Sequence, residues 1–217
     1  MNIEVLGPRG VGKTSLAKQL ASNYEIEYIS LGKIARSEIR EGTLMGQTMQ
    51  YYIDNKLPYP QGFLFPLISQ KLEQATQNGG FILDGYPRQA TEAEELNQIL
   101  RNIGISLDII IELQAGLEDI FMRVDKRLIC SNCDYQLEIG GDNTECPHCN
   151  GALIRRYDDT PEALERAYNL HLTHGEAIIN ILTAETTANL FRVDGRELPS
   201  VITTSMIYNI NQLSSTT

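Results

Sequence analysis

The chain reads Ile3-Glu4-Val5-Leu6-Gly7-Pro8-Arg9-Gly10-Val11-Gly12-Lys13-Thr14-Ser15 near its start. A short apolar strand runs into a glycine-rich turn, and an apolar helical pattern through Leu16 and Leu20 follows. Residues 7–14 match G-x-x-x-x-G-K-[ST], a pattern typical of loops that bind nucleotide phosphates. A turn that merely contains three glycines is the alternative, but the flanking strand and helix favour a phosphate-binding loop. The sequence therefore predicts binding of a nucleoside triphosphate.

Each residue type in this loop has a physical task. Glycines let backbone N–H groups point into one anion-binding concavity, and the start of the following helix adds partial positive charge. Lys13 supplies a full charge for the outer phosphates, and the hydroxyl of Thr14 or Ser15 suits a magnesium ion. Mg²⁺ bound with ATP is therefore the expected cofactor. The expected ATP-binding residues of the loop are Gly10, Val11, Gly12, Lys13, Thr14 and Ser15.

Composition limits what the chain binds. Its 217 residues are 42% hydrophobic, enough for one main domain with a buried core and small inserts. The net charge of −10 repels the phosphates of nucleic acids, so we expect no nucleic-acid partner. No apolar run approaches the ~20 residues that span a bilayer, and the first residues form a strand rather than a cleavable leader. We therefore expect a cytoplasmic protein that does not bind membranes.

Strand-like and helical segments alternate along the chain. Strands are predicted at residues 3–6, 25–29, 80–83, 107–113 and 190–193. Helices are predicted after the loop and at residues 31–40, 46–55, 62–77, 91–102, 117–127, 161–183 and 199–212. This alternation is typical of an α/β fold whose parallel sheet is covered by helices on both faces. Residues 30–60 and 128–157 do not fit the alternation, and we interpret them as inserts that carry substrate contacts.

All four cysteines lie close together, as Cys130-x2-Cys133 and Cys146-x2-Cys149. Each turn places two thiolates on one side of a tight loop, and two turns complete a tetrahedral zinc site with Zn–S bonds of about 2.3 Å. Four thiolates leave no open coordination position, so we expect the zinc to be structural. The alternatives are His148 as a replacement ligand, two disulfides, or four free thiols, and a reducing compartment disfavours the disulfides.

Further motifs follow in order along the chain. They are Leu83-Asp84-Gly85-Tyr86-Pro87-Arg88, Arg123-x3-Arg127 before the cysteine turns, Arg156-Tyr157-Asp158-Asp159, and Val193-Asp194-Gly195. With the phosphate-binding loop, they give the chain a resemblance to bacterial adenylate kinases of the long-lid, zinc-bearing type over nearly its whole length. The Asp-Gly-Tyr-Pro-Arg run resembles that family's Asp-Gly-Phe-Pro-Arg signature.

The resemblance implies an architecture and a reaction. The fold is a P-loop NTPase-type core with a five-stranded parallel sheet, formed by residues 1–29, 61–126 and 159–217. A helical NMP-binding insert at residues 30–60 and a zinc-ribbon lid at residues 127–158 complete it. The implied activity is that of a monomeric phosphotransferase, which catalyses ATP + AMP = 2 ADP by in-line transfer under a closing lid.

The resemblance also implies a set of charged residues that converge on the phosphates. For the donor these are Lys13 at the phosphates, Arg123 stacked on the base, Asp84 at magnesium-bound water, and Arg127 and Arg156 as a clamp on the transferring group. For the acceptor they are Arg36 and Arg88 at the phosphate, with Leu31, Gly85 and Glu92 beside them, and for the lid hinge Asp158 and Asp159. Arginine suits these tasks because its planar fork grips phosphate in two places.

The acceptor site departs from the family's pattern. Leu31-Gly32-Lys33 stands where the family usually reads Thr-Gly-Asp, and Glu92 replaces the base-reading glutamine. An ionised carboxylate only accepts hydrogen bonds, so Glu92 favours a base with an exocyclic amino group, such as adenine or cytosine. The family arginine beyond the lid aligns with Ala167, and we expect its neighbour Arg166 to take that role.

Three functions remain open at this point. A kinase that phosphorylates AMP is favoured. A kinase of the same fold with CMP, UMP or a deoxynucleotide as acceptor is the second. The third is a catalytically silent ATP-binding protein whose zinc ribbon contacts a partner. The joint presence of Lys13, Asp84, Arg88, Arg123 and Arg127 argues against the third, because a silent site has no physical need for so many basic groups.

Overall fold

One five-stranded parallel sheet forms the body of the protein in the computed structural model, which describes residues 1–133, 135–137, 144–156 and 159–214. The strand order is β2-β3-β1-β4-β7, and every neighbouring pair is parallel. The strands are β1 (Asn2–Leu6), β2 (Glu27–Ser30), β3 (Phe81–Asp84), β4 (Ile109–Gln114) and β7 (Asn189–Asp194). The predicted α/β fold with a five-stranded parallel sheet is confirmed.

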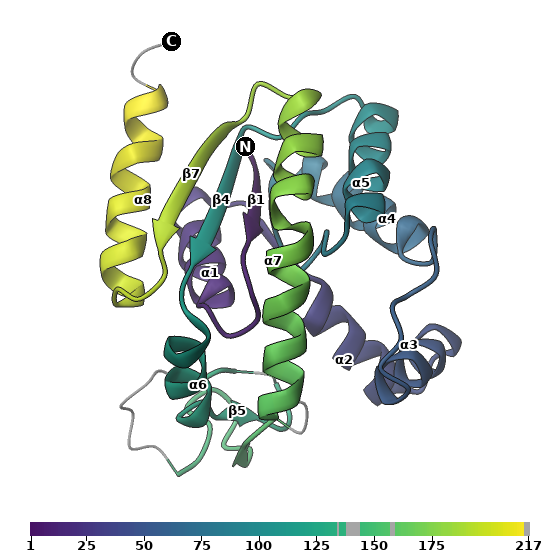
Figure 1. Cartoon of the computed structure of the whole chain (residues 1–217), viewed down its shortest axis with the longest axis vertical. Helices are drawn as coiled ribbons and strands as arrows, with labels where there is room; N and C mark the ends of the chain where they lie inside the picture. Colours follow the sequence, from purple (N-terminus) through teal and green to yellow (C-terminus); the bar gives the residue numbers. More distant parts are fainter. Residues whose placement is uncertain (134, 138–143, 157–158, 215–217) are drawn as a thin grey trace.

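Helices cover both faces of this sheet, as predicted (Figure 1). They are α1 (Lys13–Tyr24), α2 (Leu31–Glu41), α3 (Leu44–Asp54), α4 (Phe65–Gln77), α5 (Ala90–Ile103), α6 (Leu117–Asp125), α7 (Pro161–Ala184) and α8 (Pro199–Ser214). One apolar cluster joins α1 and α8 to one face of the sheet, and a second joins α4, α5 and α7 to the other. The central strands are therefore buried on both sides, which is why Phe81–Asp84 reads as a continuous buried run.

The helices differ in whether a side chain caps their first turn. Thr160 caps α7 by accepting a hydrogen bond from the N–H of Ala163 (3.2 Å), and Ser30 caps α2 through the N–H of Lys33 (3.4 Å). In contrast, α1 begins after Gly12, whose φ of 112° is left-handed, and no side chain caps it. The first N–H groups of α1 are therefore left for another acceptor.

Two smaller units leave the sheet. The helices α2 and α3 pack against each other between β2 and the segment that leads to α4. Beyond α6, the short strands β5 (Ile129–Cys130) and β6 (Leu153–Ile154) pair antiparallel and carry the first cysteine turn. Among the described helices, none is both long and apolar enough to cross a membrane.

Candidate active site

The phosphate-binding loop lies at the carboxyl end of the central strand. β1 pairs with β3 on one side and with β4 on the other, so the chain order reverses direction at β1. Parallel sheets bind ligands in the crevice at such a reversal. The loop that follows β1 opens into this crevice and leads directly into the uncapped start of α1. The sequence therefore folds locally into an anion-binding concavity.

Lys13 lies at the centre of a group of positive charges. Its Nζ donates to the carbonyl oxygens of Gly7 (2.7 Å) and Pro8 (2.8 Å) within the loop. Burial lowers the pKa of Lys13 to about 8; the charge of Asp84 opposes this shift, and those of Arg88, Arg9 and Arg127 add to it. Three arginines from separate segments thus converge on one lysine.

Arg123 ties the loop to two other segments. One guanidinium nitrogen donates to the carbonyl of Val11, and another donates to the carbonyl of Glu197, both at 3.1 Å. The helix α6 that carries Arg123 packs closely on the loop at Gly10, where a Cβ would lie 2.7 Å from Val124. A cavity of about 230 Å³ lies beside Arg123 and is lined by Asp119, Met122, Arg123, Lys126 and Arg196. Arg123 is the residue that the resemblance assigns to the donor base.

Asp84 ends β3 beside the start of α1. Its side chain is buried, and its Oδ2 accepts hydrogen bonds from Thr14 Oγ1 (2.8 Å) and from the Tyr28 hydroxyl (2.9 Å). Hydroxyl and carboxylate oxygens are hard ligands that suit Mg²⁺. The residues present therefore fit a magnesium ion that accompanies nucleotide phosphates.

A charged cluster links the loop to the beginning and end of the cysteine-bearing segment. Asp159 accepts from Arg9 Nη2 (2.8 Å) and from Arg127 Nε (2.9 Å), and a second nitrogen of Arg127 also contacts it. The Asp159 side chain is only 6% exposed, so these bonds are poorly screened by water. The predicted hinge partner Asp158 lies outside the described residues.

Two of the expected acceptor residues, Arg88 and Glu92, lie in the segment that follows β3. Arg88 donates from Nε to the carbonyl of Gly85 (2.7 Å), and its backbone N–H donates to Glu92 Oε2 (2.6 Å). Burial raises the pKa of Glu92, although hydrogen bonds from the Arg88 and Gln89 backbones oppose the shift. One Glu92 oxygen therefore holds the start of α5.

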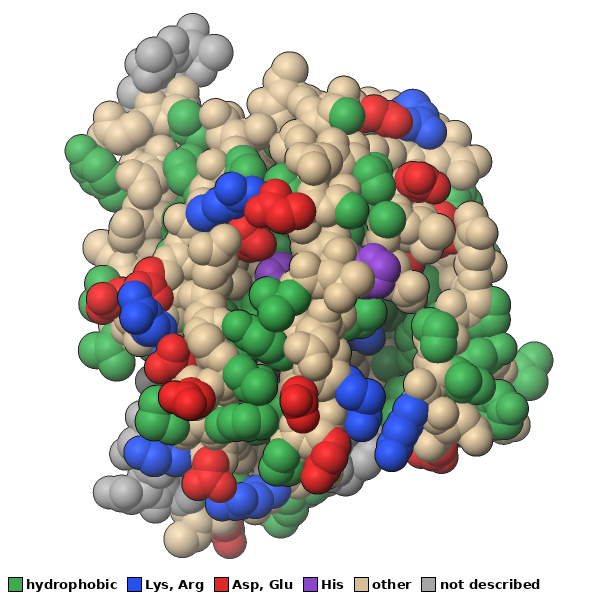
Figure 2. Space-filling model, in the orientation of Figure 1, with side chains coloured by type: hydrophobic (Ala, Val, Ile, Leu, Met, Phe, Trp, Pro, Cys, Tyr) green, Lys and Arg blue, Asp and Glu red, His purple; other side chains and the backbone are tan. Residues whose placement is uncertain are grey.

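A cavity of about 160 Å³ opens between this segment and the residues that lead from α3 to α4. Its lining includes Pro58, Tyr59, Leu64, Glu92 and Glu95. Leu31 and Arg36 lie on α2, where Leu31 is fully buried and Arg36 is half-buried. Figure 2 shows a hollow in the surface between α7 and the α2–α3 pair, with basic side chains along it.

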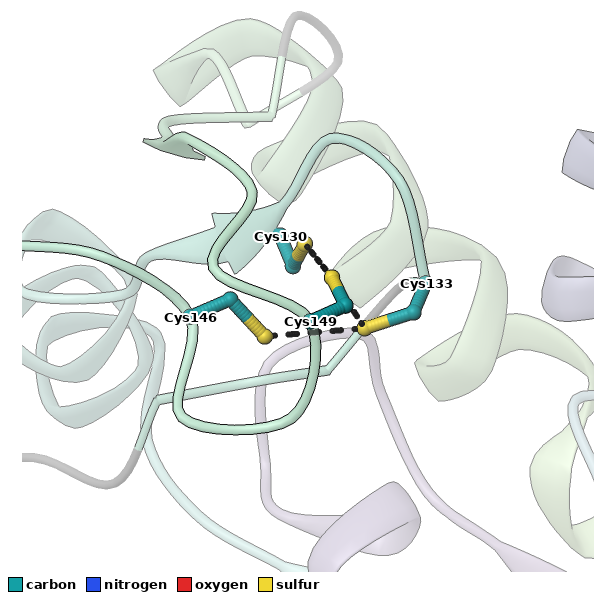
Figure 3. Close-up of side chains that lie close together, drawn as sticks. All are labelled: Cys130, Cys133, Cys146 and Cys149. Atoms are coloured by element: carbon teal, nitrogen blue, oxygen red, sulfur yellow. Dashed lines mark hydrogen bonds between the residues drawn. The ribbon is translucent and has the colours of Figure 1, made fainter.

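The four cysteines converge as the spacing predicts (Figure 3). The sulfurs lie within 4.8 Å of one another, with Cys130–Cys149 at 3.4 Å and Cys133–Cys146 at 3.6 Å. Four thiolates around one zinc ion at about 2.3 Å lie at comparable separations. Backbone N–H groups of Asn132 and His148 donate to sulfur at 3.3 and 3.4 Å. All four cysteines are free thiols, so the cluster fits a zinc ion.

The comparisons with known proteins agree with this geometry. The sequence model of the family described as adenylate kinase matches residues 5–187.

The chain belongs to the adenylate kinase family.

Adenylate kinases of several organisms are similar to it over most of their length. The adenylate kinase of Kosmotoga olearia is 32% identical over 217 residues, which cover 98% of this chain and 100% of that protein. The adenylate kinase of Pyrococcus furiosus is 36% identical over 183 residues, or 82% of each chain. The adenylate kinase of Desulforamulus reducens is 33% identical over 189 residues, which cover 85% of this chain and 89% of that protein. As a member of the adenylate kinase family, the protein is a phosphotransferase.

Two further arginines of the expected site lie in α7 and just before it. Arg166 is exposed on α7, where it adds its charge to backbone and Thr160 hydrogen bonds that lower the pKa of Glu162. Arg156 is half-buried, and its carbonyl accepts from the N–H of Asp159 (3.1 Å). The His148 ring packs on Tyr135, with the ring centroids 4.4 Å apart.

Three residues around Lys13, Asp84 and Asp159 were not predicted from the sequence. Arg9 lies inside the phosphate-binding loop, Tyr28 reaches Asp84 from the neighbouring strand, and Glu4 is a fully buried carboxyl group on β1. A glutamate within an apolar strand was the one visible signal among them. The partners of Arg9 and Tyr28 are 150 and 56 residues away, so no local pattern reveals them.

Proposed function

We propose that this protein catalyses reversible phosphoryl transfer between ATP and AMP, ATP + AMP = 2 ADP. The observation that carries the proposal is the convergence of Arg88 and Arg127 on Lys13 at the reversal point of the sheet, in a chain of the adenylate kinase family. Phosphoryl transfer asks little covalent work of a protein. It needs in-line positioning and positive charge around the negative charge that spreads in the transition state.

The phosphate-binding loop and the residues around it bind the donor ATP in this proposal. Backbone N–H groups at the start of α1 and the Lys13 ammonium group bind the phosphates, and Arg123 stacks on the base. The oxygens of Thr14, Ser15 and Asp84 hold Mg²⁺ and its water, and the ion supplies charge neutralisation at the phosphates when bound. The proposed donor residues are Gly10, Val11, Gly12, Lys13, Thr14, Ser15, Asp84 and Arg123.

Residues of α2 and of the segment that follows β3 bind the acceptor AMP in this proposal. Arg36 and Arg88 grip the phosphate of AMP, and the cavity beside Leu64 and Glu92 receives the base. One Glu92 oxygen is occupied by the Arg88 N–H, so a base meets the other oxygen, which accepts from the adenine amino group. Leu31 and Gly85 complete this side of the site.

We further propose that residues 30–60 form the acceptor insert and residues 127–158 form a lid around the core. Arg127 and Arg156 close with the lid over the transferring group, Arg166 acts on that group from α7 of the core, and Asp158 and Asp159 act at the hinge of the lid. A closed lid excludes water, which otherwise competes as an acceptor. Zn²⁺ at the four cysteines stabilises the lid. A monomeric state and a cytoplasmic location stay predictions from the sequence.

The test is an assay of ADP formation from ATP with a panel of nucleoside monophosphates. We expect the highest kcat/KM with AMP. A higher kcat/KM with CMP or UMP would assign the second function, and the carboxylate of Glu92 also suits the amino group of cytosine. Tight binding of ATP without turnover of any monophosphate would overturn both kinase functions. Leaving Mg²⁺ out of the same assay should abolish turnover.

A further inference from the structure

We propose that Tyr28 is a positioning residue for magnesium: its hydroxyl holds the Asp84 carboxylate in the orientation that a metal site would use. The proposal rests on the function given above for Asp84 and Thr14, and it assigns a role to a residue that function does not use. It concerns how the protein's own oxygens are arranged around the ion, and it is testable without turnover.

Two hydroxyl groups donate hydrogen bonds to the same oxygen atom of Asp84. Thr14 Oγ1 and the Tyr28 hydroxyl both donate to Oδ2 of Asp84, at 2.8 and 2.9 Å. They approach from different elements, because Thr14 lies in the first turn of α1 and Tyr28 lies on β2, the neighbour of β3. The carboxylate is therefore held from two sides.

The two donors are not equivalent once a metal ion arrives. The Thr or Ser hydroxyl of a phosphate-binding loop is a ligand of Mg²⁺, so Thr14 would share its oxygen between the ion and its hydrogen bond to Asp84. Tyr28 lies on β2 and not in the loop, so its bond to Asp84 would stay in place whatever position Thr14 takes. Tyr28 would therefore hold the orientation of the Asp84 carboxylate independently of the loop.

The surroundings suit Tyr28 to a permanent donor role. Tyr28 is partly buried against the cluster that joins α1 to the sheet, so its ring has little freedom to move away. A tyrosine hydroxyl carries its proton at neutral pH, so Tyr28 acts as a hydrogen-bond donor to Asp84. An uncharged donor orients the carboxylate without competing with the metal for it, as a lysine or arginine would.

Tyr28→Phe tests this with little disturbance of packing, because only one oxygen is removed. The matched control is Tyr24→Phe, whose hydroxyl donates instead to Ile207 O (3.3 Å) and Asn211 Oδ1 (3.1 Å), away from Asp84. The measured quantity is metal coupling, defined as the ratio of the ATP dissociation constants in EDTA and in excess Mg²⁺. Both constants come from calorimetric titration, and kcat and KM are measured in parallel.

We expect Tyr28→Phe to reduce the metal coupling about tenfold, as for loss of one hydrogen bond to a charged group. The ATP dissociation constant without metal and the KM for AMP should stay within about twofold of the wild-type values. Tyr24→Phe should leave all of these values unchanged. Equal weakening of ATP binding with and without Mg²⁺ would show a merely structural role and overturn the proposal. So would unchanged coupling. Failure of the wild-type protein to turn over ATP and AMP would overturn the proposed function but not this proposal, because the metal coupling is an equilibrium binding measurement.

Discussion

Arg9 in the phosphate-binding loop donates a hydrogen bond to Asp159 at 2.8 Å, although 150 residues separate the two in the chain. The same Asp159 carboxylate binds Arg127. A loop cation and a cation at the start of the cysteine-bearing segment thus share one acidic group where the donor phosphates are proposed to bind.

Arg9→Ala should therefore weaken donor binding selectively. The substitution removes one positive charge from the group around Lys13. Arg9 can exchange its bond to Asp159 for a bond to the donor triphosphate, and the variant loses that bond. We expect the KM for ATP to rise roughly tenfold, equivalent to about 1.4 kcal/mol, with the KM for AMP nearly unchanged. Arg155→Ala is the control, because that arginine forms an exposed pair with Asp125. Parallel changes in both KM values would contradict the assignment.

Arg88→Ala should impair turnover and acceptor binding together. Arg88 donates to the Gly85 carbonyl and acts electrostatically on Lys13, and loss of a phosphate-binding arginine removes charge stabilisation from the transition state. We expect kcat to fall by about 10²–10³-fold and the KM for AMP to rise, while the dissociation constant of ATP changes little. Steady-state kinetics and ATP titration measure these effects. Arg101→Ala, which breaks an exposed pair with Glu185, provides the reference, and an equal loss for both substrates would refute this role.

Glu92→Gln should increase the preference for AMP. The glutamine oxygen can still accept the bond from the Arg88 N–H, so the start of α5 is retained. Its amide group can also donate to a ring nitrogen, which a carboxylate cannot do. We expect the ratio of kcat/KM for AMP over UMP to rise by roughly fivefold, about one hydrogen bond's worth of free energy, because the uracil ring nitrogen carries a proton and cannot accept. An unchanged ratio would show that position 92 does not face the base.

Glu4→Gln should stabilise the protein, and more so as the pH rises. Burial, reinforced by the charge of Asp84, raises the pKa of Glu4 well above its ordinary value, and neither carboxylate oxygen has a hydrogen-bond partner among the described residues. The folded state therefore retains a proton that the unfolded state has lost. Stability is complete below the unfolded pKa near 4.5 and is lost as the pH rises toward the raised folded pKa.

Glutamine carries no charge to desolvate, so Glu4→Gln removes this dependence. Each unit of pKa elevation corresponds to about 1.4 kcal/mol, and 1 kcal/mol shifts Tm by about 2–4 °C in a chain of this size. We expect a higher Tm than the unchanged protein at pH 7.5 and a much smaller difference at pH 5. The exposed Glu94→Gln is the control. A lower Tm for Glu4→Gln at pH 7.5 would mean that the carboxylate stabilises the fold.

Removal of zinc should unfold the cysteine-bearing segment while the core persists. β5 and β6 contain two residues each, too little structure to hold the segment without the metal. We expect one zinc per chain by mass spectrometry. A chelator should open the segment between residues 127 and 156 to protease, with the helix content of the core retained. Unchanged protease resistance after complete loss of zinc would disprove a stabilising role for the metal.

The sheet, its helices and the cysteine cluster were predictable because their signals are local. Apolar runs such as Phe81–Asp84 specify buried strands, the glycines of the loop specify a tight turn, and two C-x-x-C turns specify one metal site. Each depends on residues a few positions apart. The α/β fold and the adenylate kinase resemblance therefore needed no knowledge of long-range contacts.

The network around the phosphates was less predictable because it joins distant segments through single side chains. Tyr28 looks like an ordinary strand residue until β2 is placed beside β3, where it reaches Asp84. Glu92 matches a base-reading position in sequence, but one of its oxygens is occupied by the Arg88 N–H. The position of Arg166 depends on the rotation of α7, and in this structure the side chain is exposed.

The contacts of Lys13 with the Gly7 and Pro8 carbonyls have a consequence for selectivity. The ammonium group is already hydrogen-bonded to its own loop, so an anion that binds it has to replace two carbonyl dipoles. A small singly charged anion gains only the ammonium group from that exchange, whereas a polyphosphate chain also engages the amides at the start of α1. These contacts therefore favour polyphosphates over small anions at the loop.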